Sequence, residues 1–190
     1  MTAVITGASS GIGRALVLEL CKEGRRVVGI SRDEASLRGL ARECREFDFI
    51  RSDLSDPRSF GLIRERLSDL GPIEILVNNA GFGAYRRILE MEKDDIVRMT
   101  FVNFLAPVLL TRELLPLMSE GSTVVNVITA GIHVLLADLP LYGATKMALH
   151  YASEALRDEL RERGVRLISV YPGLVRTAFH ARAGREVGGG

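Results

Sequence analysis

The sequence predicts an α/β protein with a doubly wound parallel β-sheet, covered by helices on both faces in a three-layer α/β/α arrangement. Short apolar segments alternate with longer amphipathic ones along the chain, which is the pattern of repeated βα units. Several short segments are runs of Val and Ile rather than strict apolar–polar alternations, as expected for strands that are buried on both faces. A glycine-rich turn directly follows the first short segment and opens the first amphipathic one.

The individual elements can be placed from this alternation. Strands are expected at Ala3–Thr6, Arg26–Ser31, Asp48–Arg51, Ile73–Asn78, Thr123–Ile128 and Arg166–Tyr171. Helices are expected near Ile12–Glu23, Glu34–Arg45, Ser59–Leu70, Lys93–Met118 and Leu141–Arg163. Gly24 and Gly164 each follow a helix at a position suited to its C-cap. No linker divides the chain, so residues 1–190 are expected to form a single domain.

Composition limits the classes of partner. Hydrophobic residues make up 47% of the chain and charged residues 26%, as in ordinary globular proteins. With 25 basic and 24 acidic side chains, nothing favours binding to nucleic acid or to an anionic membrane. No apolar run reaches the roughly 18 residues that suggest a membrane span. A strand rather than a signal peptide is expected at the N-terminus, and we expect a cytoplasmic protein.

The cysteines and histidines do not form a recognisable metal or disulfide pattern. Cys21 and Cys44 are too few for a disulfide framework or a structural zinc site, and both are interpreted as small core residues. His133, His150 and His180 are scattered without metal-ligand spacing. No metal site is therefore expected.

The run Thr6-Gly-Ala-Ser-Ser-Gly-Ile-Gly13 connects the first strand to the first helix. Glycines let the backbone turn sharply and approach a pyrophosphate, and the helix N-terminus offers free N–H groups and the positive end of its dipole. This context predicts a Rossmann-type dinucleotide site, and a glycine turn without a ligand is the alternative. The candidate binding residues in the run are Gly7, Ser9, Ser10, Gly11, Ile12 and Gly13.

The end of the second strand bears on the choice of dinucleotide. An acidic residue there would bind the ribose 2′-hydroxyl of NAD(H), whereas an arginine would accommodate the 2′-phosphate of NADP(H). The strand ends at Ser31, and Arg32 follows. This predicts NADP(H) over NAD(H). A solvated surface arginine is the alternative, and Asp33 fits the cap of the next helix.

Tyr142 and Lys146 are four residues apart and are expected on one face of a helix. A free tyrosine has a pKa of about 10, too high for a base at neutral pH. An ammonium group about 4–5 Å away would favour the phenolate by roughly 3–4 kcal/mol at an effective dielectric constant of about 20. The pair could therefore act in general acid–base catalysis. On spacing alone, a Tyr and a Lys four residues apart on a helix are more often exposed surface residues without a catalytic role.

Taken in order, these motifs resemble a short-chain dehydrogenase/reductase of the simple, single-domain type over nearly the whole chain. The glycine run resembles the cofactor loop of that family, and Tyr142-Gly-Ala-Thr-Lys146 resembles its active-site motif. Asp53 and Leu54 resemble the pair that contacts adenine in the family, and Asn103 resembles the helix asparagine of its catalytic set. The structural motif after the fourth strand is resembled by Asn78, Asn79, Ala80 and Gly81. The segment that holds the nicotinamide amide is resembled by Pro172, Gly173 and Thr177.

The resemblance implies a role for each catalytic residue. Tyr142 would pass a proton to or from the substrate oxygen, and Lys146 would lower the pKa of Tyr142 and hold the nicotinamide ribose. Asn103 would help to seat a water that relays protons from Lys146. A hydroxyl residue thirteen positions before the tyrosine would orient the carbonyl, and counting back gives Thr129.

Two features depart from the family pattern. The carbonyl-orienting residue is normally a serine, and Thr129 adds a methyl group that restricts its rotamer. A register slip of one would place Ile128 there, and the donor would be lost. The chain also stops soon after Phe179, where family members continue with a further strand and helix. The final strand is thus expected to be absent, and Arg166–Tyr171 is expected to form an exposed sheet edge.

The favoured function is an NADP(H)-dependent oxidoreductase that interconverts a ketone or aldehyde and its alcohol. A non-catalytic dinucleotide-binding protein, or an inactive truncated family member, is the main alternative. An epimerase or dehydratase would need a larger substrate domain. The small-molecule substrate is expected to be apolar, because several apolar residues could line its pocket: Phe82, Tyr85, Val134, Leu135, Leu136, Leu139 and Leu141. His133 could face the substrate.

A homo-oligomer, either a dimer or a tetramer, is also expected. The dimer would be built on the helices around Phe101–Met118 and Leu141–Arg163. Apolar residues of the second helix are too widely spread for one core-facing stripe, namely Met147, Leu149, Tyr151 and Leu156. Packing of all four on their own sheet is the alternative.

Overall fold

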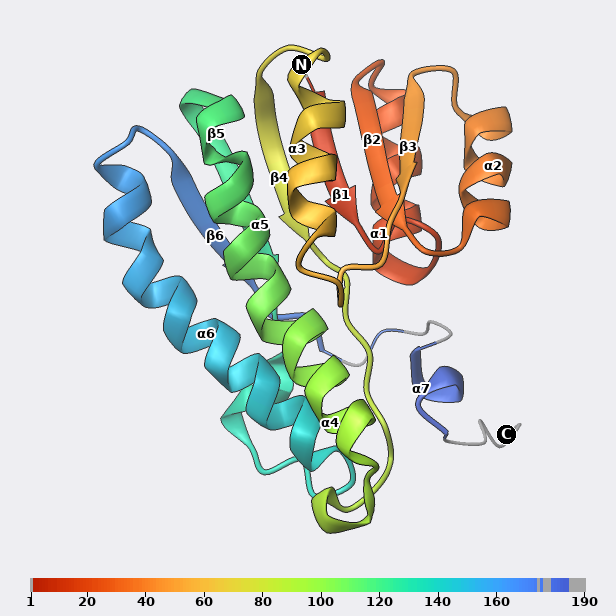
Figure 1. Ribbon diagram of the computed structural model, residues 1–190, viewed down its shortest axis with the longest axis vertical. Coiled ribbons are helices and arrows are strands. Elements are labelled where there is room, and N and C mark those ends of the chain that lie inside the picture. Colours follow the sequence, from red (N-terminus) through yellow and green to blue (C-terminus); the bar gives the residue numbers. More distant parts are fainter. Residues whose placement is uncertain (1, 174, 176–178, 185–190) are drawn as a thin grey trace.

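The computed structural model describes residues 2–173, 175 and 179–184. Their six strands form one parallel sheet in the order β3-β2-β1-β4-β5-β6, which confirms the predicted Rossmann-type fold (Figure 1). The strands are β1 (Thr2–Thr6), β2 (Arg26–Ser31), β3 (Phe47–Arg51), β4 (Ile73–Asn78), β5 (Met118–Val127) and β6 (Arg166–Val170). The α-helices are α1 (Gly11–Lys22), α2 (Glu34–Glu43), α3 (Ser59–Ser68), α4 (Lys93–Thr100), α5 (Ala106–Leu114), α6 (Pro140–Arg161) and α7 (Phe179–Arg182).

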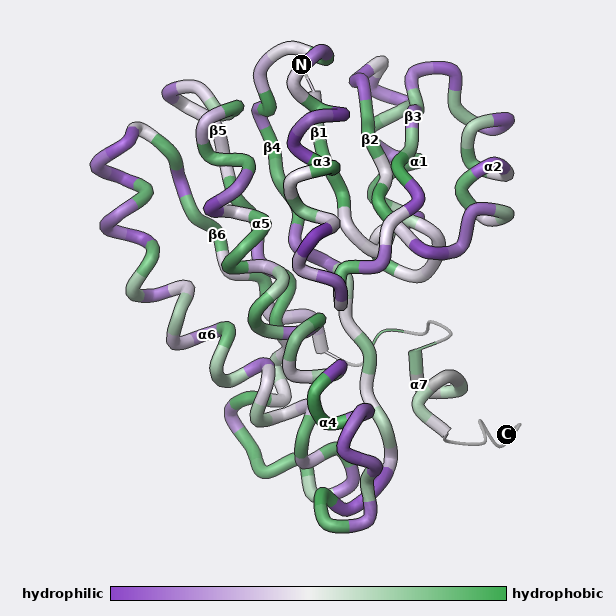
Figure 2. Tube along the Cα trace, viewed as in Figure 1, coloured by the Kyte–Doolittle hydropathy of each residue, from purple (hydrophilic) through white to green (hydrophobic). Residues whose placement is uncertain are grey.

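Alternation along the strands distributes side chains between two cores. Val4 and Val28 point to the face covered by α3, α5 and α6, while Ile5 and Val27 point to the face covered by α1 and α2 (Figure 1). The helices are amphipathic, and Figure 2 shows hydrophilic and hydrophobic residues alternating along α2 and α6. Burial on both faces explains the apolar runs in the strands.

The sheet ends at β6 within the described residues, as predicted. On this edge strand, Ile168 is 46% exposed and Val170 is 40% exposed. Ile168 pairs with Val125 and so shares the face on which α1 and α2 lie. These two helices pack over the opposite end of that face, so the three-layer arrangement is incomplete over β6 in the described part of the chain.

The predicted helix Lys93–Met118 is interrupted in the structure. A π-helical segment (Phe101–Leu105) joins α4 to α5, a 3₁₀ turn (Leu115–Leu117) follows, and Met118 already belongs to β5. Pro107 explains the irregularity, because it has no N–H to donate to the carbonyl of Asn103 four residues earlier. π-Helical turns of this kind are frequent at functional sites.

By length and composition, the helical stretch Lys93–Leu117 could cross a membrane. This stretch is not an unbroken apolar run, because charged residues such as Arg98 and Arg112 interrupt it. In this fold the inner side of the stretch packs on the domain core, where Met99, Leu110 and Leu114 are buried. Core helices of globular proteins share this length and composition.

The cysteines pack in the core as predicted, but the sequence analysis missed the bond between them. Cys21, at the end of α1, and Cys44, after α2, are joined in a disulfide, with their Cα atoms 5.9 Å apart. The two helices lie on one face of the sheet, which brings their C-terminal ends within the distance that a disulfide spans. The glycine caps that follow α1 and α6 were correctly predicted, because Gly24 and Gly164 have φ values of +70° and +71°.

Candidate active site

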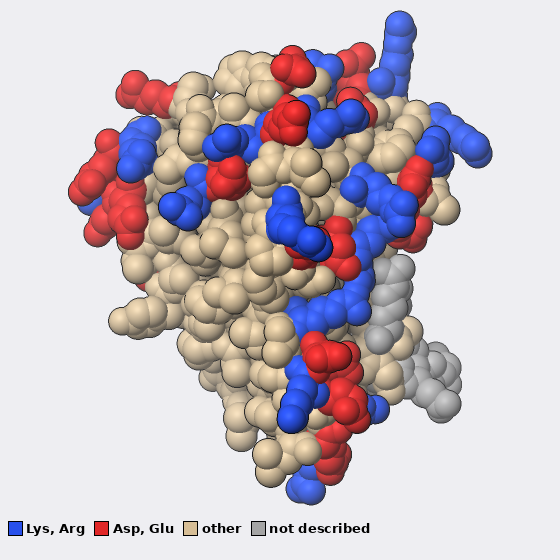
Figure 3. Space-filling model, viewed as in Figure 1, with Lys and Arg blue, Asp and Glu red and all other residues tan. Residues whose placement is uncertain are grey.

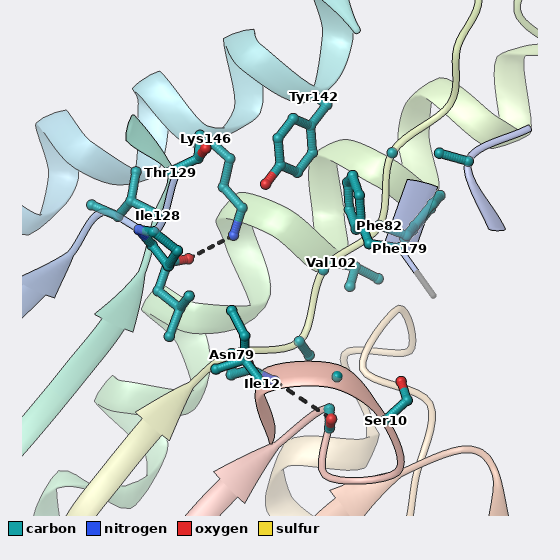
Figure 4. A pocket seen from close by; sticks show the side chains of 18 of the residues that line it. Ser10, Ile12, Asn79, Phe82, Val102, Ile128, Thr129, Tyr142, Lys146 and Phe179 are labelled. Carbon is teal, nitrogen blue, oxygen red and sulfur yellow. Dashed lines mark hydrogen bonds between the residues drawn. The ribbon is translucent and has the colours of Figure 1, made fainter. Parts of the chain in front are cut away.

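A cavity of about 780 Å³ lies at the carboxyl ends of the strands. It extends from the glycine loop after β1 to Tyr142 at the start of α6 (Figure 4). The strand order reverses between β1 and β4, and this switch point is where doubly wound sheets bind their ligands.

The glycine loop has no room for side chains at two positions. A Cβ atom at Gly13 would collide with the Gly7 carbonyl oxygen and lie 2.6 Å from Nδ2 of Asn79. Gly7 has a φ of +67°, a backbone conformation that glycine adopts without strain. The Ser10 side chain does not cap α1, and the first turn of α1 contains no acidic residue. The helix N-terminus is therefore suited to a phosphate group.

The segment after β4 braces this loop. The Asn79 side chain donates to the Thr6 carbonyl oxygen over 3.0 Å, and the backbone N–H groups of Asn79 and Ala80 both donate to the Thr6 hydroxyl at 3.0 Å. Asn78 turns inward and donates to the side chain of Asn126 on β5. The motif thus fixes the loop geometry, and Asn79, Ala80 and Gly81 also line the cavity.

Ser31, Arg32, Asp53 and Leu54 line the far end of the cavity. The Ser31 hydroxyl donates to the hydroxyl of Ser9 at 2.8 Å, which links β2 to the glycine loop. The Arg32 guanidinium lies 3.7 Å from the Asp53 carboxylate, and both side chains are about half exposed. The neighbouring Asp33 accepts from the backbone N–H of Ser36 and caps α2, as predicted.

Three predicted catalytic side chains meet at the inner end of the cavity. Tyr142 lies in the first turn of α6, and its side chain lines the cavity together with Thr129. Lys146 follows one turn later, is only 3% exposed, and donates to the Val127 carbonyl oxygen at 2.7 Å. Figure 4 shows the Tyr142 hydroxyl and the Lys146 ammonium pointing into the same space. Thr129 and Ile128 both line the cavity, so the assignment of Thr129 as the carbonyl-orienting residue stays a prediction.

The electrostatics of the pair differ from the sequence prediction. Burial raises the pKa of the Tyr142 phenol to about 12, and the Thr129 side chain opposes this only in part. Burial also lowers the pKa of the Lys146 ammonium to about 8. The predicted lowering of the tyrosine pKa is thus wrong for this state, because Lys146 Nζ is bound to Val127 and lies 6.0 Å from the Tyr142 ring centroid.

Asn103 is fully buried in the π-helical segment. Its side chain accepts from the Phe82 N–H at 3.0 Å and donates to the Phe82 carbonyl at 2.8 Å and to the Thr145 hydroxyl at 3.1 Å. These bonds fix the backbone at the cavity wall. The Asn103 backbone carbonyl lacks its usual helical donor because position 107 is proline.

The segment after β6 closes another side of the cavity. Pro172 and Gly173 line it, and the Pro172 carbonyl accepts from the backbone N–H of Ala130 at 2.9 Å. Thr177, the remaining predicted residue of this segment, lies outside the described residues. Among the residues that are described, no three His, Cys, Asp or Glu side chains gather as a possible metal site.

The apolar wall of the cavity was only partly predicted. Phe82, Leu136 and Leu139 line it as expected, whereas Val134 and Leu135 are 66% and 88% exposed. Tyr85, Leu141 and His133 do not line it, and the His133 ring faces that of Tyr171. The sequence analysis missed Gly83, Arg98, Val102, Val175, Phe179 and Ala183 as lining residues.

Phe179 on α7 is the most informative of the missed residues. Its ring centroid lies 5.1 Å from that of Tyr142, and its Cζ would be 3.0 Å from a Cβ atom at Gly83. A glycine at position 83 thus makes room for the phenylalanine. No periodic signal in the sequence connects these two positions.

Comparison with known proteins decides the family. Residues 1–187 match the family described as short chain dehydrogenase. The chain belongs to the short-chain dehydrogenase/reductase family. D-Erythrulose reductase from Gallus gallus is 34% identical to it over 179 residues, which cover 92% of this chain and 71% of that relative.

Solved structures of short-chain dehydrogenases share the fold. One from Sphingobium yanoikuyae, in complex with NADPH, matches with a TM-score of 0.89 at 28% identity, over 98% of this chain and 75% of that one. A second, from Burkholderia phymatum in complex with NAD, matches with a TM-score of 0.89 at 27% identity, over 98% and 70%. This short-chain dehydrogenase/reductase is thus an NAD(P)-dependent oxidoreductase.

Proposed function

We propose that this chain is an NADP(H)-dependent reductase of ketones or aldehydes, in which Tyr142 supplies the proton. One observation carries the proposal. The side chains of Tyr142 and Thr129 line the same end of the cavity, beside the buried ammonium of Lys146 (Figure 4). A carbonyl oxygen that entered this space could accept from both hydroxyls, as general acid catalysis requires.

The residues present fit a dinucleotide. The glycine loop would hold the pyrophosphate against the start of α1, and Gly7 and Gly13 have no space for a side chain there. Asp53 and Leu54 would contact the adenine end, while Pro172 and Gly173 would contact the nicotinamide end. When bound, the nicotinamide supplies the hydride, and the protein supplies position and a proton.

The protonation state of Tyr142 suits the role of proton donor. With a pKa near 12, its phenol stays protonated at neutral pH and can donate to the carbonyl oxygen as that oxygen gains charge. Thr129 would hold the same oxygen in place. Lys146 would then return a proton to Tyr142, with a water at the Asn103 carbonyl as the relay.

The cavity wall bears on the substrate. Phe82, Val102 and Leu139 present an apolar surface near Tyr142. D-Erythrulose reductase is named for a small sugar, but this wall favours a less polar carbonyl compound here. NADPH oxidation should be measured with apolar ketones and aldehydes and with D-erythrulose at equal concentrations. We expect the apolar compounds to react fastest. No oxidation with any of them would favour a non-catalytic dinucleotide-binding protein.

The coenzyme preference depends on Arg32. We expect NADPH to bind at least tenfold more tightly than NADH, since an arginine–phosphate contact contributes about 1.5–3 kcal/mol. Arg32→Ala should remove most of this preference and leave NADH binding unchanged. Calorimetric titration of both coenzymes measures the effect, and equal affinities in the wild type would contradict the assignment.

Thr129 gives a test of carbonyl orientation. Thr129→Val keeps the shape and removes the donor, so kcat/KM should fall about 10-fold or more, as when a hydrogen bond to the reacting oxygen is lost. Thr129→Ser keeps the hydroxyl and should stay active. The unfolding temperature controls for packing. Unchanged kinetics in the valine variant would show that another group orients the carbonyl.

We also propose a homodimer through the α5 and α6 surface, with one correction from the structure. Leu149 is fully buried and Leu156 packs on the core, whereas Met147 and Tyr151 are 45% and 79% exposed. An interface must therefore use the exposed pair. Tyr151→Asp should convert the dimer to a monomer in light scattering at micromolar concentration. Leu62→Asp adds the same charge at an exposed position of α3 and should leave the dimer intact. A monomeric wild type would refute the dimer.

A further inference from the structure

A second arginine lies beside Arg32. β2 and β3 are parallel neighbours, and their register pairs Ser31 with Arg51 at the ends of the two strands. Carboxyl ends of parallel strands meet at one edge of the sheet, so Arg51 reaches the same edge as the glycine loop. The hydrogen bond between Ser9 and Ser31 fixes that loop against β2 only one residue from Arg32.

The two arginines share a cavity. A hollow of about 360 Å³ is lined by Arg32, Arg51, Ser52 and Asp53. Three of these residues, Arg32, Ser52 and Asp53, also line the large cavity, so the two spaces adjoin. A group projecting from the adenosine end of the large cavity would enter the hollow that both arginines line.

The local carboxylates hold these arginines only loosely. Arg32 lies 3.7 Å from Asp53, and Arg51 lies 3.8 Å from Glu34, distances too long for hydrogen bonds. Asp53 already accepts from the backbone N–H and hydroxyl of Ser55. Glu34 already accepts two bonds from Arg38. Both guanidinium groups can therefore turn to a stronger anion without leaving a carboxylate unsatisfied.

We propose that Arg51 binds the 2′-phosphate of NADP(H) jointly with Arg32, which rests on the NADP(H) preference proposed above. A phosphate monoester carries a charge of about −1.5 to −2 at pH 7, more than one guanidinium neutralises. Two planar guanidinium groups supply several donors to its oxygens. NAD(H) has a hydroxyl there and gains nothing comparable from either arginine. Glu34 opposes the contact because it attracts Arg51 away from the phosphate.

Nucleotide fragments test this without turnover. Calorimetric titration with 2′,5′-ADP and 5′-AMP should show a clear wild-type preference for 2′,5′-ADP. Arg51→Gln should weaken 2′,5′-ADP binding about tenfold and change 5′-AMP binding less than about twofold, as expected for a charged hydrogen bond. Arg58→Gln, at an exposed arginine that lines neither cavity, removes the same charge and should change neither affinity. Glu34→Gln should tighten 2′,5′-ADP binding.

The outcomes separate the two proposals. In one outcome, the wild type prefers 2′,5′-ADP, Arg32→Gln loses that preference, and Arg51→Gln binds both fragments as Arg58→Gln does. This outcome refutes the role of Arg51 and leaves the NADP(H) assignment in place. If the wild type binds both fragments equally, both proposals are refuted. The Arg51 side chain is 69% exposed, so its replacement should leave the unfolding temperature unchanged.

Discussion

Tyr142→Phe is expected to lower kcat for carbonyl reduction by about 10²–10⁴-fold, the usual contribution of a positioned proton donor. Coenzyme affinity should stay within about twofold, because the phenol oxygen alone is removed. The phenylalanine ring can still pack against Phe179, whose ring lies 5.1 Å from that of Tyr142. Steady-state kinetics combined with coenzyme titration separate the two effects.

Tyr171→Phe provides the matched control. Tyr171 hydrogen-bonds to His150 and does not line the cavity, so losing its hydroxyl should leave turnover intact. If Tyr142→Phe keeps more than about a tenth of the wild-type kcat, another group supplies the proton and the assigned role is wrong.

Lys146→Met is expected to abolish turnover, weaken coenzyme binding and stabilise the protein at pH 7. Burial lowers the pKa of Lys146 from 10.5 to about 8. At about 1.4 kcal/mol per pKa unit, holding the charge inside the fold costs roughly 3 kcal/mol. Losing the hydrogen bond to the Val127 carbonyl offsets about 1–3 kcal/mol of this. A net gain near 1 kcal/mol would raise the unfolding temperature by about 2–4 °C.

The pH dependence distinguishes this cause from better packing. Because the folded-state pKa is the lower one, the unfolded chain binds more protons between about pH 8 and pH 10.5. Wild-type stability should therefore rise with pH across this window, and the advantage of Lys146→Met should disappear by about pH 10. An advantage of the same size at pH 7 and pH 10 would exclude the buried charge as its source.

Local chemistry made much of the fold predictable. Val and Ile runs identified the strands because both sheet faces are buried, and Gly24 and Gly164 marked helix ends because only glycine adopts positive φ there without strain. Counting along the chain selected Thr129, which lines the same cavity as Tyr142. The catalytic roles themselves remain predictions.

The unpredicted features depend on contacts between distant residues. The disulfide requires α1 and α2 to lie side by side, which the spacing of Cys21 and Cys44 does not show. The pKa of Tyr142 depends on the position of the Lys146 ammonium. That ammonium donates to the Val127 carbonyl, a contact that the sequence does not indicate. The π-helical segment did have a local signal in Pro107, which the apolar periodicity masked.

Deuterium transfer tests the central claim most directly. NADPH labelled at the transferable position of the nicotinamide, in each of its two stereochemical forms, should be incubated with a ketone that supports NADPH oxidation. Mass spectrometry of the product should show an alcohol with one deuterium on the carbinol carbon from one labelled form only. Tyr142→Phe should give almost none. Absence of labelled alcohol with the wild type, or equal labelling by both proteins, would contradict a reductase that depends on Tyr142.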